Sequence, residues 1–184
     1  MTGAFVLGPL LLLLVSSLAR SVQHPPWMAS ETRVVGVISD THGLLRPEAL
    51  AALHASEVII HAGDVGDPEI LDQLRAIAPT FAVRGNVDTS PWAQALPLTE
   101  VVDVGGVQFY VLHNLLDLCL DPKAAGFAAV ISGHTHRPHA QVRNDVLYLN
   151  PGSAGPRRFT LPIAVARIEV TGSHISHEII ELQV

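Results

Sequence analysis

Seven side chains carry donor atoms that bind first-row transition metals, and each follows a short apolar run. Four are imidazoles, two are carboxylates and one is an amide: Asp40, His42, Asp64, Asn86, His113, His134 and His136. Seven donors exceed what one tetrahedral ion uses and suit two adjacent ions that share a carboxylate. Imidazole mixed with carboxylate favours Mn, Fe, Ni, Co or Zn over Ca and leaves the choice among them open.

Taken together, the motifs around these residues are more informative than each is alone. Asp40-Thr41-His42 by itself is typical of a turn or a cap, and Gly63-Asp64 is weaker still. Gly133-His134-Thr135-His136 is more specific, because no structural propensity calls for two histidines at this spacing after a glycine. Their joint occurrence after successive strands predicts one site.

Short buried strands are expected to position these side chains. The apolar runs that end just before a candidate ligand are Arg33–Ser39, Glu57–His61, Thr80–Val83, Val107–Leu112 and Phe127–Ser132. Helices are predicted over Pro47–His54 and Glu69–Ala76, the second after an Asp67-Pro68 start. This alternation predicts an α/β sheet with parallel neighbours, whose carboxyl edge binds ligands.

The second half of the chain predicts hairpins instead of helices. Three pairs of apolar runs flank tight turns: Val101–Val104 and Val107–Leu112 around Gly105-Gly106, Gln141–Arg143 and Val146–Leu149 around Asn144-Asp145, and Ile163–Val170 and Ile175–Ile180 around Thr171-Gly172. We therefore expect a mixed sheet or two stacked sheets, not a simple doubly wound fold.

Composition narrows the class of protein. With 48% hydrophobic and 15% charged residues, the 184-residue chain is not disordered, and its length fits a single domain, which we place at residues 33–184. The net charge of -6 argues against a broad nucleic-acid surface. The one cysteine, Cys119, excludes an intrachain disulfide and a thiolate zinc cluster, and we expect it to be an apolar filler.

Residues 1–30 form a hydrophobic leader and a linker. Residues 4–19 are apolar apart from two serines, and this run is short for a membrane span of about 20 residues. Three interpretations stay open: a cleaved signal, an uncleaved anchor, or an extension upstream of a true start at Met28. A cytoplasmic location is favoured if Met28 is the start, and export or anchoring through residues 4–19 is the alternative. No stable membrane span is expected in the domain itself.

The remaining histidines carry no recognisable partner pattern. His61 falls in a buried strand and is interpreted as a packed histidine that supports the site. Solvated or structural roles are expected for the other histidines of residues 33–184: His54, His139, His174 and His177. Arg157-Arg158 is interpreted as surface charge.

The motifs resemble the five signature blocks of the calcineurin-like metallophosphoesterases, and most closely the YfcE-like phosphodiesterases. The matching segments are Ser39-Asp40-Thr41-His42-Gly43, Gly63-Asp64, Val83-Arg84-Gly85-Asn86, Asp88, His113, Gly133-His134-Thr135-His136-Arg137-Pro138 and Asn150-Pro151-Gly152-Ser153. The resemblance implies an αββα sandwich of two mixed β-sheets flanked by helices. It also implies hydrolysis of a small phosphodiester or phosphomonoester by a hydroxide between two divalent ions, with Mn favoured.

The same resemblance allocates the candidate ligands. Asp40, His42 and His136 would hold one ion; Asn86, His113 and His134 would hold the other; Asp64 would bridge. Asn86 would also contact substrate. No protein side chain is assigned as the catalytic base.

Two positions depart from the wider superfamily. Val87 stands where many members have a histidine that assists the leaving group, and Asn114 stands where Gly usually follows the histidine. The competing hypothesis is a scaffold, like the retromer subunit with this fold, and the complete ligand set favours an enzyme. A homo-oligomer stays open.

Overall fold

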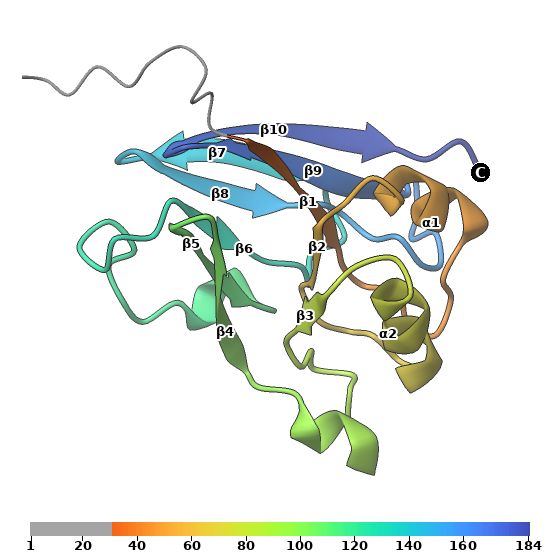
Figure 1. The fold of residues 1–184 in the computed structure, drawn as a ribbon. Helices are drawn as coiled ribbons and strands as arrows, with labels where there is room; N and C mark the ends of the chain where they lie inside the picture. The colour runs from red at the N-terminus through yellow and green to blue at the C-terminus, as the bar shows by residue number, and fades with distance from the viewer. Residues whose placement is uncertain (1–30) are drawn as a thin grey trace, which may run out of the picture.

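A computed structural model describes residues 31–184, so the leader and its three interpretations lie outside the described residues. Two five-stranded sheets face each other (Figure 1). The first has the order β10-β9-β1-β2-β3 and the second β4-β5-β6-β8-β7. This confirms the fold class of two mixed sheets.

Each sheet combines parallel and antiparallel neighbours. The first consists of β1 (Thr32–Ile38), β2 (Val58–His61), β3 (Thr80–Ala82), β9 (Ala164–Thr171) and β10 (His174–Glu181). The second consists of β4 (Thr99–Val104), β5 (Val107–Leu112), β6 (Ala129–Ile131), β7 (His139–Arg143) and β8 (Val146–Asn150). Strands β1, β2 and β3 are parallel, as are β5, β6 and β8.

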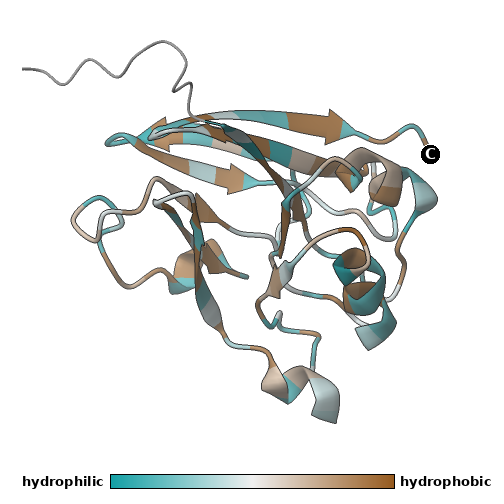
Figure 2. Cartoon of the chain, in the orientation of Figure 1, coloured by the Kyte–Doolittle hydropathy of each residue, from teal (hydrophilic) through white to brown (hydrophobic). Residues whose placement is uncertain are grey.

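Aliphatic side chains fill the space between the sheets. Val35 and Ile60 of the first sheet belong to one buried cluster with Phe109 and Ile131 of the second. In Figure 2 the strands carry both brown and teal segments, so hydrophobic and hydrophilic residues alternate along several of them. The central strand β6 is buried throughout, as expected where a strand is buried on both faces, whereas β7 and β10 are mostly exposed. This core fixes the two sheets relative to each other.

The helices cover only the first sheet. Helices α1 (Pro47–Leu53) and α2 (Pro68–Arg75) pack beside β1–β3 and bury Leu53, Leu71 and Leu74 in one cluster (Figure 1). The outer face of the second sheet is covered by the chain between β5 and β6, through Leu115, Leu118 and Phe127. That segment has one 3-10 turn, η2 (Leu115–Asp117); a second 3-10 helix, η1, spans Pro91–Ala95.

The predicted helices and strands all occur, with bounds within two residues of those expected. One interpretation is wrong: Cys119 is exposed on the loop after η2 and fills no core. Among the helices of residues 31–184, none is long and apolar enough to cross a membrane.

Candidate metal centre

Five parallel strands bring the candidate ligands to one edge. Strands β1, β2 and β3 end just before Asp40, Asp64 and Asn86, while β5 ends before His113 and β6 before the loop with His134 and His136. Backbone hydrogen bonds join the strand ends: the Gly133 amide donates to the His113 carbonyl within the second sheet, and the Ala154 amide, beyond β8, donates to the Ser39 carbonyl beyond β1 of the first sheet. All seven candidates therefore lie where the two carboxyl edges meet.

The backbone at this edge is unusual. Five of the seven candidates are non-glycine residues with positive φ: Asp40 (54°), His42 (48°), Asp64 (56°), His134 (69°) and His136 (58°). A left-handed conformation is unfavourable by about 1–2 kcal/mol for an L-residue, so surrounding contacts must hold it in place. Such residues cluster at functional sites.

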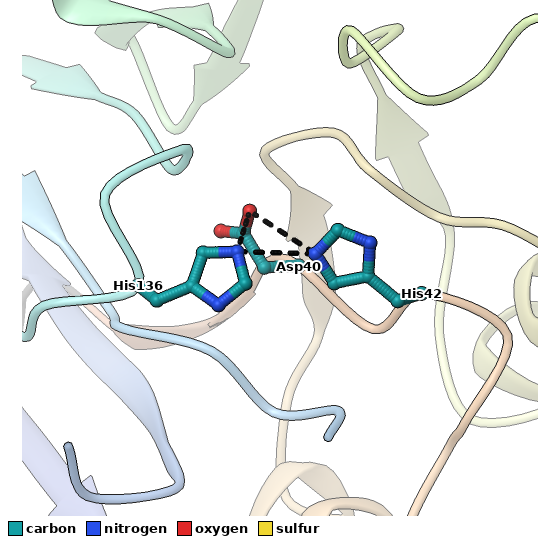
Figure 3. A group of neighbouring side chains, drawn as sticks. All are labelled: Asp40, His42 and His136. Carbon is teal, nitrogen blue, oxygen red and sulfur yellow. Dashed lines mark hydrogen bonds and ion pairs between the residues drawn. The ribbon is translucent and has the colours of Figure 1, made fainter. Parts of the chain in front are cut away.

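Asp40, His42 and His136 form what we call the buried half of the site (Figure 3). The two imidazole rings approach the Asp40 carboxylate from two sides, with their Nε2 atoms 3.0 Å apart. His136 Nε2 lies 3.2 Å from Asp40 Oδ1, and His42 Nε2 lies 3.9 Å from it. Burial lowers the pKa of His42 despite the nearby carboxylates, which favours the neutral imidazole that ligation requires.

One oxygen of Asp40 has no hydrogen-bond donor. Its Oδ2 accepts bonds from the Ser39 hydroxyl (2.7 Å) and the His134 amide (3.1 Å), whereas Oδ1 is buried without a partner. A buried carboxylate oxygen without a donor is costly unless a cation satisfies it. The unpaired Oδ1, facing two imidazole nitrogens, thus fits a bound transition-metal ion.

Asn86, His113 and His134 form the open half, because Asn86 and His134 are exposed. Asn86 Oδ1 lies 3.1 Å from His113 Nε2 and 3.0 Å from His134 Nδ1. His113 Nδ1 donates to the Ala62 carbonyl at 2.7 Å, which directs Nε2 toward Asn86. A second bond of this kind is how proteins fix the tautomer of a ligating histidine.

Asp64 lies between the halves. Its Oδ2 is 3.9 Å from His42 Nε2 and 3.3 Å from His113 Nε2. Burial raises the Asp64 pKa, but hydrogen bonds with His113 and the Val87 amide outweigh it, so the pKa lies below its usual value. For His113 the effects have the opposite sign: burial lowers its pKa, but its hydrogen bonds to Asp64 and the Ala62 carbonyl outweigh burial, so the pKa lies above its usual value. An ionised carboxylate facing both halves could serve two ions.

Asp88 supports the open half, a role the sequence did not reveal. Its buried carboxylate accepts amide hydrogen bonds from Val65 (3.1 Å), Gly66 (2.9 Å) and Gly85 (2.9 Å). These bonds tie the loop that carries Asp64 to the loop that carries Asn86. The position of Asp88 in the Gly85-Asn86-Val87-Asp88 motif was the available signal.

His61 supports the buried half, as interpreted from the sequence. The Gly63 amide donates to His61 Nδ1 (3.2 Å), so Nε2 carries the proton and donates to Thr41 Oγ1 (2.9 Å). The Thr41 hydroxyl then donates to the Val65 carbonyl (2.9 Å). Burial lowers the pKa of His61 from 6.5 to about 4, so the ring is neutral at physiological pH.

The segment after β8 supports both histidine-bearing loops. Asn150 Nδ2 donates to the Gly133 carbonyl (2.6 Å), and the Ser153 hydroxyl donates to the Asp40 carbonyl (2.9 Å). A side chain at Gly133 would overlap the side chains of Ser39 and Asp40, so only glycine permits this approach. The motif Asn150-Pro151-Gly152-Ser153 therefore positions Asp40 and the loop of His134.

Val87 and Asn114, the two positions that depart from the superfamily pattern, both make defined hydrogen bonds. Val87 is partly exposed, and its amide donates to Asp64 Oδ1 at 2.9 Å. Asn114 has a negative φ of -104°, so no glycine is required there, and its side chain caps η2 by accepting from the Leu116 amide. None of the other five histidines belongs to a cluster that could hold an ion within residues 31–184.

The fold and site place the chain in a known superfamily. A sequence profile of the calcineurin-like phosphoesterase superfamily domain matches residues 34–173. A probable metallophosphoesterase of Methanocaldococcus jannaschii is 39% identical over 135 residues, 66% of this chain and 68% of that protein. The chain belongs to the calcineurin-like phosphoesterase superfamily.

Solved structures share the fold. Vacuolar protein sorting 29 from Cryptosporidium parvum has a TM-score of 0.71 at 20% identity and covers 83% of this chain and 92% of its own. An archaeal phosphodiesterase has a TM-score of 0.66 at 22% identity, and the match covers 80% of this chain and 99% of that one. The phosphoesterase YfcE from E. coli has a TM-score of 0.57 at 21% identity, and the match covers 82% of this chain and 100% of that one. At these identities, the likeness supports the two-sheet fold alone.

Proposed function

We propose that the chain is a phosphodiesterase that works with two divalent metal ions. Asp40, His42 and His136 hold one ion in this proposal. Asn86, His113 and His134 hold the other, and Asp64 is shared. The observation that carries the proposal is the position of Asp64 Oδ2, which faces His42 on one side and His113 on the other.

The ions, when bound, attract phosphate oxygens and lower the pKa of water toward about 7, which supplies a nucleophile at neutral pH. Mn is favoured for the donor set, and Ni, Fe, Co and Zn are alternatives. The protein itself orients the donors: Ser39 and the His134 amide hold Asp40, and Ala62 holds His113. Asn86, exposed between two histidines, contacts the phosphate.

The leaving alcohol receives no proton from position 87. Valine stands there, and its side chain has no transferable proton. We therefore expect aryl esters, whose leaving groups need no protonation, to react faster than alkyl esters. One protein of similar fold is an archaeal phosphodiesterase, and this likeness supports a diester over a monoester.

Metal removal and restoration test the proposal. Protein stripped of metal should not hydrolyse bis(p-nitrophenyl) phosphate, and Mn²⁺ or Ni²⁺ should restore turnover. The same assay with p-nitrophenyl phosphate compares monoesters with diesters. Hydrolysis that survives exhaustive chelation contradicts the proposal.

The alternative function is a scaffold of the same fold, favoured by the likeness to vacuolar protein sorting 29. The seven donors in proximity favour the enzyme, because a scaffold does not need them. A protein that binds two equivalents of Mn²⁺ and hydrolyses none of a panel of mono- and diesters would favour the scaffold.

A further inference from the structure

A cavity of about 380 Å³ opens on the open half of the site. Asn86, His113 and His134 line this cavity, so any phosphate held by these residues borders it. A second cavity, of about 430 Å³, reaches Gly133 and Thr135 but contains none of the seven candidate ligands. The first cavity is therefore the one in direct continuity with the proposed reaction site.

The lining residues around the start of β4 are held in place by the sheets. Leu98 and Thr99 lie at the start of β4, where Thr99 pairs with Leu112 of β5. The Arg84 amide donates to the Pro97 carbonyl at 2.8 Å, which ties this segment to the end of β3. The wall is thus preformed.

Asn114 also lines the cavity. Its side chain accepts from the Leu116 amide at 3.1 Å, and its carbonyl accepts from the Asp117 amide at 3.0 Å. These bonds form η2 and place Asp117 on the cavity wall. The residue that departs from the family pattern therefore helps to shape this cavity.

The lining combines an apolar surface with a few polar groups. Leu98, 64% exposed, offers apolar surface, Leu112 lines the cavity from the core at 1% exposure, and Asp117 offers a carboxylate that accepts hydrogen bonds. Arg84, the one cation of the lining, is already bonded to Gln94. A second phosphate would meet Asp117 and find no free cation among these lining residues, whereas an apolar ring with a hydrogen-bond donor matches them.

We propose that this cavity binds one of the two ester groups of the phosphodiester substrate, and that this group is a nucleoside. The inference rests on the proposed function, because the phosphate must lie at the seven-residue site. The volume of the cavity lies in the range of about 300–1,000 Å³ that is typical of small-molecule sites. Leu98, Thr99 and Asp117 are then the residues that decide which ester group is accepted.

Calorimetric binding tests the cavity without turnover. The probes are thymidine 5′-monophosphate and methyl phosphate, which share the phosphate and differ in the group that would enter the cavity. The variants of Mn²⁺-loaded protein are Thr99→Trp, which fills the cavity, and Leu98→Ala, which removes apolar wall. Leu116→Ala is the matched control, because Leu116 is 90% exposed and does not line the cavity.

Wild type and Leu116→Ala should bind the nucleotide about tenfold more tightly than methyl phosphate, since apolar contact adds to phosphate binding. Thr99→Trp should abolish that preference, and Leu98→Ala should reduce it about threefold, while methyl phosphate affinity stays the same. Equal affinities in wild type, or equal effects of Leu98→Ala and Leu116→Ala, would overturn the inference. A retained preference without diester hydrolysis would instead contradict the proposed function alone.

Discussion

The buried and open halves of the site differ in what surrounds their donors. Asp40 and His136 are 0% and 6% exposed, and the unpaired Asp40 Oδ1 lies between imidazoles. Asn86 and His134 are exposed and adjoin the cavity. In the proposed centre, two imidazoles join a buried carboxylate in one half and an exposed amide in the other, so we expect the first half to retain its ion and the second to be accessible.

Each half also has its own support behind the candidate ligands. The His61–Thr41 pair lies behind the buried half, and the Asp88 carboxylate joins the loop of Asn86 in the open half to the loop of Asp64. The comparison teaches that metal affinity depends on the ligands and also on the residues behind them that keep the ligands rigid. Four experiments break or sharpen this comparison.

The largest effect is expected from Asp64→Asn, because Asp64 faces both halves. Loss of several kcal/mol of charge stabilisation corresponds to a fall in kcat of about 10³-fold. The measurement is hydrolysis of bis(p-nitrophenyl) phosphate with bound Mn²⁺ counted in parallel, and circular dichroism as the check on folding. Near-normal turnover would remove Asp64 from the bridging role.

The second effect is a pH dependence of stability from His61. Its pKa is about 4 in the folded chain and 6.5 as the ordinary value, so the unfolded chain takes up the proton first as the pH falls. The contribution of the neutral His61 to the free energy of unfolding is on the order of 3 kcal/mol. It is fully present above pH 6.5 and is lost as the pH falls toward 4.

Denaturant unfolding of metal-free protein at a series of pH values measures this loss. His61→Gln cannot titrate and is the reference for all other groups. Wild type should lose more stability than His61→Gln between pH 6.5 and pH 4. Parallel curves for the two proteins would show that His61 does not remain neutral in the folded chain.

The third experiment compares the two halves directly. His136→Ala should weaken the tighter of two Mn²⁺ binding events by about 10–100-fold, and His134→Ala should weaken the other. The reason is that His136 faces the unpaired, buried Asp40 oxygen, whereas His134 is exposed. Calorimetric titration of Mn²⁺ measures both events. Weakening of the tight event by His134→Ala to the same degree would abolish the distinction.

The smallest effect is expected from Asp88→Asn, which keeps the size of the side chain but presents only one acceptor oxygen to three amides. We expect a loss of about 1–3 kcal/mol in the free energy of unfolding and about tenfold weaker Mn²⁺ binding in the open half. Asp72→Asn is the matched control, because Asp72 is exposed and pairs only with Arg75. Equal effects of the two variants would deny Asp88 its positioning role.

Much of this architecture could be predicted because it depends on local patterns. Buried apolar runs such as Val107–Leu112 predict strands, and polar residues at their ends predict a shared edge. The three hairpins followed from turn chemistry at sites such as Asn144-Asp145, where both residues have positive φ. The histidine pair of Gly133-His134-Thr135-His136 was informative because nothing local explains it.

What could not be predicted depends on contacts between distant segments. The role of Asp88 needs the loops after β2 and β3 to meet, and the cavity needs the start of β4 beside η2. The exposure of Cys119 depends on how the segment after β5 lies on the second sheet. No periodicity records these placements, since they arise from the register and packing of whole sheets.

The positive φ angles at five candidate ligands have a consequence for protein engineering. Glycine at the exposed His134 would relax the backbone while deleting a donor, so such a substitution can favour the metal-free fold at the expense of chemistry. A directed-evolution campaign that selects heat resistance alone would therefore reward loss of the site. Libraries of this protein should be screened for turnover and heat resistance together.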